Sequence, residues 1–361
     1  MDEEADDSAV RWQRELRRTV RTAAELETVL RLTEAERQGA LAAEGGGFPI
    51  AITPHILSLI DPEDPRCPVR VQFVPRVEES VIAAGDLRDP LGEEAHQVAP
   101  ELIRRYPDRA LLLLTDRCAV YCRFCTRSRI VGTGGGARSL SVLEPAFAYL
   151  RAHPEVRDVI LSGGDPMLLK TEKLVAVLER LREIASVETI RIATRVPVVL
   201  PTRVTEEWTQ AIRRFHPVWI MTHFNHPKEL HPDARAACER LVDAGFPVMN
   251  HTVLLRGVND DPEVLESLFR GLVRCRVRPY YLLQADPVRG TSHLRTPLQV
   301  GLDVMARLQG RLSGIALPKF IVDTPGGFGK VPVLPDYVVS REAGVTRFRT
   351  PRGVEVDYLD P

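Results

Sequence analysis

Short apolar runs alternate with helical stretches through most of the chain, and this alternation constrains the fold more than any other feature. It is typical of βαβ units and a parallel sheet. The predicted strands are Ala110–Thr115, Asp158–Ser162, Thr189–Thr194, Val218–His223, Val248–Leu254 and Arg278–Leu283. The predicted helices include Glu144–Ala152, Lys173–Ile184, Glu206–Phe215, Asp233–Ala244, Pro262–Cys275 and Leu298–Leu312. Six strands, where a closed barrel has eight, predict an open α/β fold, a partial (β/α)6 TIM-like barrel.

The two ends of the chain carry other patterns. Apolar residues recur in Trp12–Leu32 with a period near 3.6, which predicts a helix. A glycine triplet at 45–47 ends a second helical stretch, and frequent Pro and Gly from 48 to 100 predict short helices in an irregular wrap. We therefore predict a mainly helical region at 1–105, a partial barrel at 106–318, and a C-terminal segment with a glycine-rich loop at 319–361.

The charge balance excludes several classes of partner. The chain has 48 Lys+Arg against 49 Asp+Glu, so nothing favours nucleic acid or an anionic membrane. No apolar run approaches the roughly 20 residues of a membrane span, and the first residues lack the apolar core of a signal peptide. We therefore expect a cytoplasmic protein, whose cysteines are thiols or metal ligands rather than disulfides.

Three cysteines, Cys118, Cys122 and Cys125, follow the first predicted strand with the spacing C-x3-C-x2-C. Their polar neighbours argue against three core thiols. A structural zinc ion usually takes two close pairs of ligands, and the chain has no second pair. Three thiolates suit an iron–sulfur cluster, and a four-iron cluster would keep one iron open for reaction. In a barrel the loop after a strand lies at the face where active sites form.

Three other motifs are ambiguous when each is taken alone. The segment 162–165 (SGGD) has the composition of an ordinary turn between strand and helix. His223 and Asn225 end the fourth predicted strand, a position that favours the cavity of a barrel. The loop 325–330 (PGGFGK) lacks the Walker pattern, so its lysine could be a solvated turn residue.

Taken together, these motifs resemble the lysine 2,3-aminomutase family of the radical S-adenosylmethionine superfamily. The resemblance runs from about Trp12 to Tyr358 and includes CAVYCRFCTRSR, RRYPDRALLLLTDRC, LSGGDP, RIATRVPVVLP, THFNHP, TVLLRGVND, RPYYLLQAD and VDTPGGFGKVPVLP, in the order of the family. It implies the partial barrel independently. It also implies an isomerase that moves an amino group between C2 and C3 of lysine, giving β-lysine. The implied cofactors are a [4Fe-4S] cluster, S-adenosylmethionine and pyridoxal phosphate.

The resemblance also implies a role for individual residues. Cys118, Cys122 and Cys125 would hold the cluster, and Lys330 would be catalytic, forming a Schiff base with pyridoxal phosphate. The other residues implied around pyridoxal phosphate are Arg105, Tyr106 and Arg109. Those implied to contact S-adenosylmethionine are Ser162, Gly163, Gly164, Asp165, His223 and Asn225. The substrate would be held by Arg127 at its carboxylate and by Asp286 and Asp323 at its distal ammonium.

The chain departs from the family at two places. His251 stands where the family usually has Gln, which bears on binding of the nucleoside. No cysteine follows Cys275, whereas clostridial members carry a C-terminal cysteine cluster for zinc, so we predict no zinc. The implied partners are an electron donor, such as flavodoxin or ferredoxin, and further copies of the chain in a homo-oligomer.

Several alternatives stay open at the level of sequence. The substrate could be arginine or another amino acid, or the β-lysine could serve modification of elongation factor P. Glutamate is disfavoured because Asp286 and Asp323 would repel its side chain. A protein of another class, an iron–sulfur protein without catalysis, would need a fourth ligand from Cys67, Cys238 or Cys275.

Overall fold

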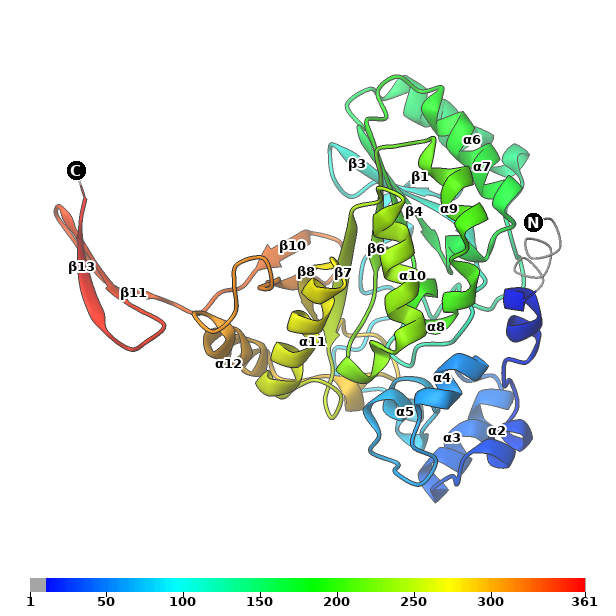
Figure 1. The fold of residues 1–361 in the computed structure, drawn as a ribbon, viewed down its shortest axis with the longest axis horizontal. Coiled ribbons are helices and arrows are strands. Elements are labelled where there is room, and N and C mark those ends of the chain that lie inside the picture. Colours follow the sequence, from blue (N-terminus) through cyan, green and yellow to red (C-terminus); the bar gives the residue numbers. More distant parts are fainter. Residues whose placement is uncertain (1–10, 361) are drawn as a thin grey trace.

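The structure is a computed structural model that describes residues 11–360. Figure 1 shows a curved sheet with helices along one side, a group of short helices at one end, and a small separate sheet that projects from the body. Within the described residues, no helix is both long enough and apolar enough to cross a membrane.

The main sheet has ten strands in sequence order, and β3 to β9 all run parallel. β2 and β10 pair antiparallel at its two ends, and no pairing in residues 11–360 joins those ends, so the barrel is open. The strands are β1 Gln97–Ala99, β2 Leu102–Ile103, β3 Arg109–Thr115, β4 Asp158–Gly163, β5 Thr189–Ala193, β6 Val218–Thr222, β7 Val248–Leu254, β8 Arg278–Gln284, β9 Lys319–Thr324 and β10 Gly329–Pro332. The six predicted strands and the partial barrel are confirmed, and β9 adds one more parallel strand.

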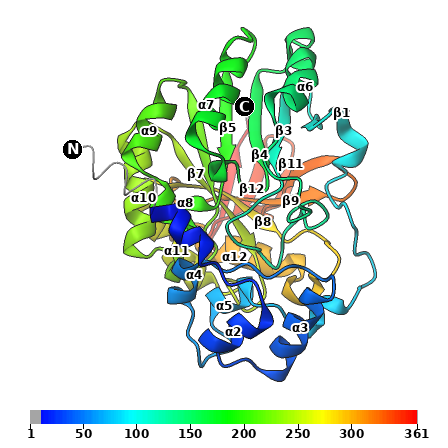
Figure 2. The same ribbon diagram turned by 90° about the vertical axis from the view of Figure 1, so that its right-hand side faces the viewer.

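Helices connect the parallel strands and cover the outer face of the sheet (Figure 2). They are α6 Leu140–Ala152, α7 Thr171–Arg182, α8 Val196–Val199, α9 Glu206–Arg213, α10 Pro232–Asp243, α11 Pro262–Arg274 and α12 Leu298–Leu308. Side chains of Ser139, Thr205 and Asp261 cap the first turns of α6, α9 and α11, as expected at helix starts. Short 3-10 turns lie at η1 Val77–Ser80, η2 Glu94–His96, η3 Pro166–Leu168, η4 Pro201–Arg203, η5 Pro227–Glu229 and η6 Ser292–Leu294.

The N-terminal region consists of short helices gathered at one end of the molecule in both Figures 1 and 2. They are α2 Ala23–Val29, α3 Glu34–Glu44, α4 Pro54–Leu59 and α5 Pro68–Phe73. The prediction of one helix over Trp12–Leu32 is wrong. Residues 11–17 are helical, but the backbone of Val20 then pairs with Ile52, and Thr22 caps a new helix, α2. The predicted helix end at the glycine triplet is confirmed at Gly45.

Buried polar contacts hold the N-terminal region together and attach it to the barrel. Arg70 of α5 forms a fully buried ion pair with Glu36 of α3 at 2.8 Å. The Thr53 hydroxyl, which also caps α4, donates to the Val199 carbonyl oxygen of α8 at 2.6 Å. The first turn of α4 is therefore fixed against the helices that cover the sheet.

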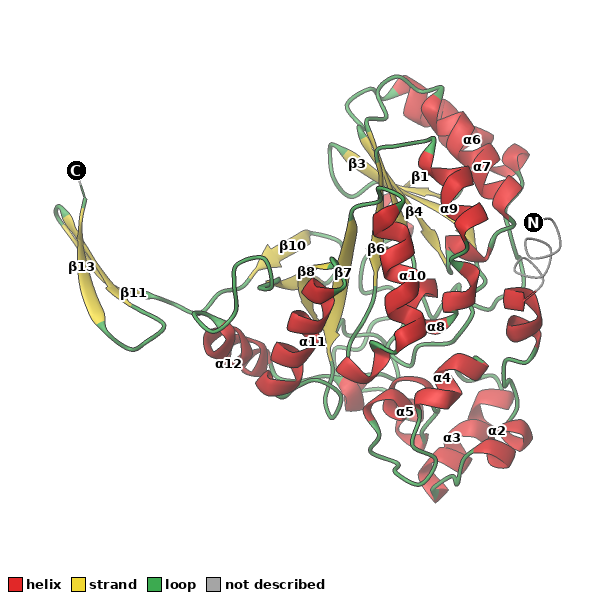
Figure 3. Cartoon of the chain, viewed as in Figure 1, coloured by secondary structure: helices red, strands yellow, loops and turns green. Residues whose placement is uncertain are grey.

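The last described strands form a sheet of their own. β11 Val338–Glu342, β12 Val345–Arg349 and β13 Glu355–Leu359 pair antiparallel and project from the body, as the strand colouring of Figure 3 makes clear. β9 and β10, in contrast, belong to the main sheet. The division into three parts at 105 and 318 stays a prediction.

Candidate active site

Alternate side chains of the parallel strands line a cavity inside the curved sheet. Leu111 of β3, Ile160 of β4 and Arg191 of β5 are register partners, and so are His251 of β7 and Tyr281 of β8. All five border a cavity of about 380 Å³. The residues next to them in β3, β4 and β5 point the other way and are buried under the helices, as the two-residue repeat of a strand requires.

The cavity collects cationic and aromatic groups. The four residues predicted to surround pyridoxal phosphate all line it, namely Arg105, Tyr106, Arg109 and Lys330. The guanidinium of Arg109 lies 4.3 Å from the centre of the Tyr106 ring. Guanidinium groups and an aromatic ring suit a phosphate and a pyridine ring, so these residues fit pyridoxal phosphate.

Arg191 and His251 also line this cavity, although the sequence did not place them there. Arg191 adds a further guanidinium, held by Asp158 at 2.9 Å. The His251 ring lies beside the stacked pair Tyr280 and Tyr281, with ring centres 5.6 and 5.4 Å away, and its buried Nε2 has no hydrogen-bond partner. Burial, aided by the charge of Lys330, lowers the pKa of His251 to about 3, so its ring is neutral. An unpartnered polar atom at the cavity wall is consistent with a bound ligand.

A hairpin places Lys330 directly opposite an acidic residue. Lys330 in β10 is the register partner of Asp323 in β9, and its ammonium donates to that carboxylate. The backbone N–H of Lys330 donates to the Tyr106 hydroxyl at 2.9 Å. In the turn, Gly327 has φ 86°, and a Cβ there would lie 2.8 Å from the Leu91 carbonyl oxygen. Glycine is thus needed for the loop to reach the cavity.

Asp323 also borders a second cavity, of about 400 Å³, together with Asp286. Arg105 donates to Asp323 at 2.5 Å, so two cations surround this carboxylate. Burial disfavours the charge of Asp323, but Arg105 and Lys330 more than offset it and lower its pKa. Burial, and then the charge of Asp323, raise the pKa of Asp286 to about 7. The two predicted substrate carboxylates are therefore brought together, next to Lys330.

Arg127 lines the first cavity and is held by two residues. Its Nε and Nη2 donate to Glu93 at 2.9 and 2.7 Å, and its Nη1 donates to the Ser162 hydroxyl at 2.9 Å. Burial disfavours the charge of Glu93, but Arg127 and Arg129 lower its pKa overall. Glu93 was not assigned from the sequence, because it lies far from Arg127 along the chain. These hydrogen bonds to Glu93 and Ser162 fix the guanidinium of Arg127 at the cavity wall.

The three predicted cysteines lie on the loop after β3 and are partly buried. Burial, and then Cys122, raise the pKa of Cys125 to about 12, so its thiol ionises at neutral pH only beside a cation. Within residues 11–360, only one group of three Cys, His, Asp or Glu residues has its ligand atoms within 4.8 Å of one another. That group does not include the three cysteines of this loop. Three sulfurs that each bind one zinc ion at about 2.3 Å would have to lie within 4.8 Å of one another, and these do not. The loop therefore fits an iron–sulfur cluster better than a single metal ion.

Arg195 joins the cysteine loop to the rest of the site, and sequence reasoning missed it. This buried residue donates to Cys122 Sγ at 2.8 Å, to Glu229 at 2.7 Å and to Gln72 at 2.6 Å. Its position just after β5, in the string RIATR, is the signal that could have indicated it. A cation beside a thiolate stabilises the negative charge of that ligand.

The segment 162–165 packs against the backbone of the cysteine loop. A Cβ on Gly163 would overlap the Thr115 carbonyl oxygen, and one on Gly164 would overlap that of Arg117. Asp165 accepts hydrogen bonds from Thr194 at 2.7 Å and from the Arg195 N–H at 2.8 Å. The glycines and the aspartate thus position the loop, and their contact with S-adenosylmethionine stays a prediction.

His223 and Asn225 form hydrogen bonds with other residues of the protein. His223 Nε2 donates to Asn225 Oδ1 at 3.0 Å, and that oxygen also accepts from the Val253 N–H at 2.9 Å. The buried amide of Asn225 donates to Gln72 at 3.0 Å. Neither residue borders the cavities that contain Lys330 and Asp286, so their role as ligand contacts stays a prediction as well.

Replacement of the loop cysteines tests the cluster site. Each of Cys118→Ala, Cys122→Ala and Cys125→Ala should lose nearly all cluster iron after anaerobic reconstitution, because a cubane held by two thiolates is labile. Single Cys67→Ala, Cys238→Ala and Cys275→Ala variants are the controls, since these thiols are buried in the core. Iron analysis and visible absorption measure the result. Iron lost from a control variant would indicate a fourth protein ligand.

Comparison with known proteins identifies this arrangement. Residues 112–268 match the model of the radical SAM superfamily, and residues 305–361 match the Lysine-2,3-aminomutase model. The L-lysine 2,3-aminomutase of Clostridium subterminale is 46% identical over 99% of this chain and 85% of its own length. The glutamate 2,3-aminomutase of Clostridioides difficile is 39% identical over 99% of this chain and 84% of its own length. The chain therefore belongs to the lysine 2,3-aminomutase family of radical SAM enzymes.

Proposed function

We propose that this chain interconverts L-lysine and β-lysine by moving the amino group between C2 and C3. The observation that carries the proposal is the juxtaposition of Lys330 with two carboxylates. Lys330 borders one cavity and pairs with Asp323, which borders a second cavity together with Asp286. A lysine proposed to hold pyridoxal phosphate, which binds one substrate amine, thus lies beside a pair of acids suited to a second ammonium group. A diamino acid such as lysine offers both amines.

The family works with a [4Fe-4S] cluster, S-adenosylmethionine and pyridoxal phosphate. When bound, these groups supply the radical chemistry that removes and returns a hydrogen atom, and a carbonyl that holds the migrating nitrogen. We assign the cluster to Cys118, Cys122 and Cys125, and the carbonyl of pyridoxal phosphate to Lys330. Arg105, Tyr106 and Arg109 would hold its phosphate and ring. Ser162, Gly163, Gly164, Asp165, His223 and Asn225 remain our candidates for contacts with S-adenosylmethionine.

The protein contributes binding and orientation of the substrate. Arg127, held by Glu93 and Ser162, presents a fixed guanidinium for the substrate carboxylate. Asp286 and Asp323 would receive the distal ammonium, which replaces the charge that Lys330 gives to Asp323 in the free protein. With both ends held, C2 and C3 lie at a defined place in the cavity, as a reaction between bound groups requires.

Arginine is a second candidate substrate, because a guanidinium also pairs with two carboxylates. Glutamate would place a carboxylate beside Asp286 and Asp323, so its affinity should be low. We further propose a low-potential electron donor, such as flavodoxin or ferredoxin, because the cluster must receive an electron. We also propose a reducing compartment such as the cytoplasm, because the cysteine ligands must stay reduced.

A substrate panel tests the proposed activity. The reconstituted enzyme, with S-adenosylmethionine and dithionite under anaerobic conditions, is offered L-lysine, L-arginine and L-glutamate separately. We expect β-lysine from lysine, and at least 100-fold slower conversion of glutamate, because two buried like charges cost about 3 kcal/mol or more. Mass spectrometry after derivatisation measures the products. Faster conversion of glutamate or arginine would overturn the assignment of lysine.

The pH dependence of KM tests the acidic pair. Asp286, with a pKa of about 7, attracts the ammonium only when ionised, so KM for lysine should fall as pH rises through 7. Below that pH the ionised fraction drops up to about tenfold per pH unit. Asp286→Asn should raise KM and flatten the profile, whereas Asp303→Asn, on the exposed face of α12, should change neither. An unchanged profile in Asp286→Asn would contradict the role of this carboxylate.

Reductive trapping tests Lys330. Borohydride should fix pyridoxal phosphate on the peptide that contains Lys330 in the wild-type protein. Lys330→Ala should trap less than about a tenth of that amount, because the free amine is the nucleophile. The matched control is Lys319→Ala, which removes an exposed lysine from the neighbouring strand β9. Equal trapping in Lys330→Ala, located on another lysine by peptide mass spectrometry, would refute the assignment.

A further inference from the structure

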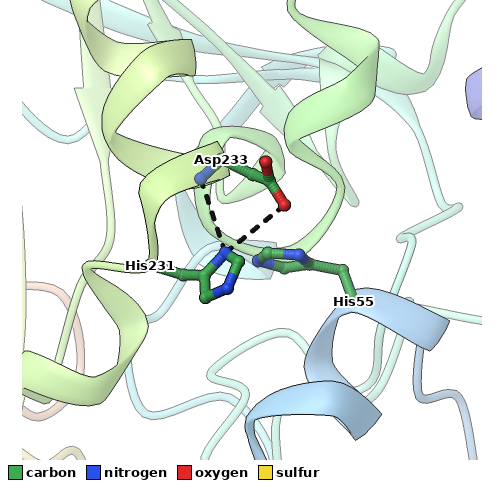
Figure 4. Close-up of side chains that lie close together, drawn as sticks. All are labelled: His55, His231 and Asp233. Atoms are coloured by element: carbon green, nitrogen blue, oxygen red, sulfur yellow. Dashed lines mark hydrogen bonds and ion pairs between the residues drawn. The ribbon is translucent and has the colours of Figure 1, made fainter.

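A cluster of metal-binding side chains lies outside the candidate active site, where α4 meets the first turn of α10. It consists of His55, His231 and Asp233, which converge in Figure 4. Ligand atoms of all three lie within 4.8 Å of one another, the only such trio in the described part of the chain. Two imidazoles and a carboxylate are ligands that zinc and related ions accept.

Two of these residues are held in place by the start of α10. His231 is the N-cap residue, and its Nδ1 accepts a long hydrogen bond of 3.4 Å from the Asp233 N–H. The same Nδ1 lies 3.3 Å from Asp233 Oδ2. The helix start therefore fixes an imidazole nitrogen and a carboxylate oxygen side by side.

His55 supplies an independent indication of a ligand. The residue is only 8% exposed, and its Nε2 is buried without a hydrogen-bond partner. Its ring meets that of His231 edge-on, with 5.4 Å between centres. His55 Nε2 therefore has no polar partner within the described part of the protein. A bound cation would satisfy this nitrogen.

We propose that His55, His231 and Asp233 bind a divalent transition-metal ion of the zinc type, with water completing the shell. The ion would join α4 of the N-terminal region to α10 of the barrel. The hydrogen bond from Thr53 to Val199 already joins the start of α4 to α8, another helix of the barrel. The prediction that the chain binds no zinc rested on the lack of C-terminal cysteines, and this site uses none. The proposal is independent of the proposed catalytic function.

Zinc binding to the full-length, reconstituted enzyme tests the proposal. The enzyme is dialysed against ZnCl₂, free metal is removed, and zinc per chain is measured by mass spectrometry. We expect one zinc per chain with an N/O shell at about 2.0–2.1 Å by X-ray absorption, and no sulfur at about 2.3 Å. Zinc should also raise the melting temperature, since it binds the folded state.

Three variants decide which residues hold the ion. His55→Phe and His231→Asn should each lose at least nine-tenths of the zinc and its effect on melting. Asn preserves the helix cap, so this variant remains informative even if His55→Phe fails to fold. The control is His153→Ala, which removes a partly exposed histidine that pairs with Glu155 at 3.1 Å, with the same sequence spacing as His231 and Asp233. It should bind zinc like the wild type.

Three results would overturn the proposal. If the wild-type enzyme binds no zinc, His231 is only a helix-capping residue that lies beside the buried His55. A sulfur shell would place the ion on the cysteine loop. Unchanged zinc content and melting in His231→Asn would move the site elsewhere.

Discussion

Each strand of a parallel sheet sends alternate side chains to its two faces, and the arrangement of this site depends on that repeat. One face of the sheet packs under α6 to α12, so its side chains are apolar and buried. The other face forms the cavity, and register pairing brings Leu111, Ile160 and Arg191 into one row. Because the sheet curves without closing, β10 can add Lys330 to the edge of the same cavity, and Asp323 of β9 borders the second cavity beside it.

A charged side chain buried in this site needs a partner of opposite charge, and the ion pairs of the site supply one. Asp323 is balanced by Arg105 and Lys330, and Arg127 is balanced by Glu93. Removing one partner from a buried pair is costly, so a substrate that displaces Lys330 from Asp323 must bring a replacement positive charge. In the function that we propose, a diamino acid would bring this charge as its distal ammonium, and its carboxylate would join Glu93 at Arg127. The ion pairs of the free protein thus indicate the charges of its ligand.

Local patterns in the sequence predicted much of this arrangement. The six strands were predictable from short apolar runs, and the cysteine loop and Lys330 from their motifs. The division of Trp12–Leu32 into two helices was not, because it depends on pairing between Val20 and Ile52, which are distant along the chain. Glu93 and Arg195 were missed for the same reason, since each acts through a partner on another element. Motif matching also does not tell a ligand contact from a structural one, as the internal hydrogen bonds of Asp165 and Asn225 illustrate.

The central claim is that this cavity moves the α-amino nitrogen of lysine to C3 within one molecule. The most direct measurement is ¹⁵N and ¹³C NMR of the product formed anaerobically from L-lysine labelled with ¹⁵N at the α-amine, in the presence of unlabelled ammonium. Our account predicts β-lysine with the full label bonded to C3. Product that has exchanged its label with ammonium, or that still carries the label on C2, would contradict it.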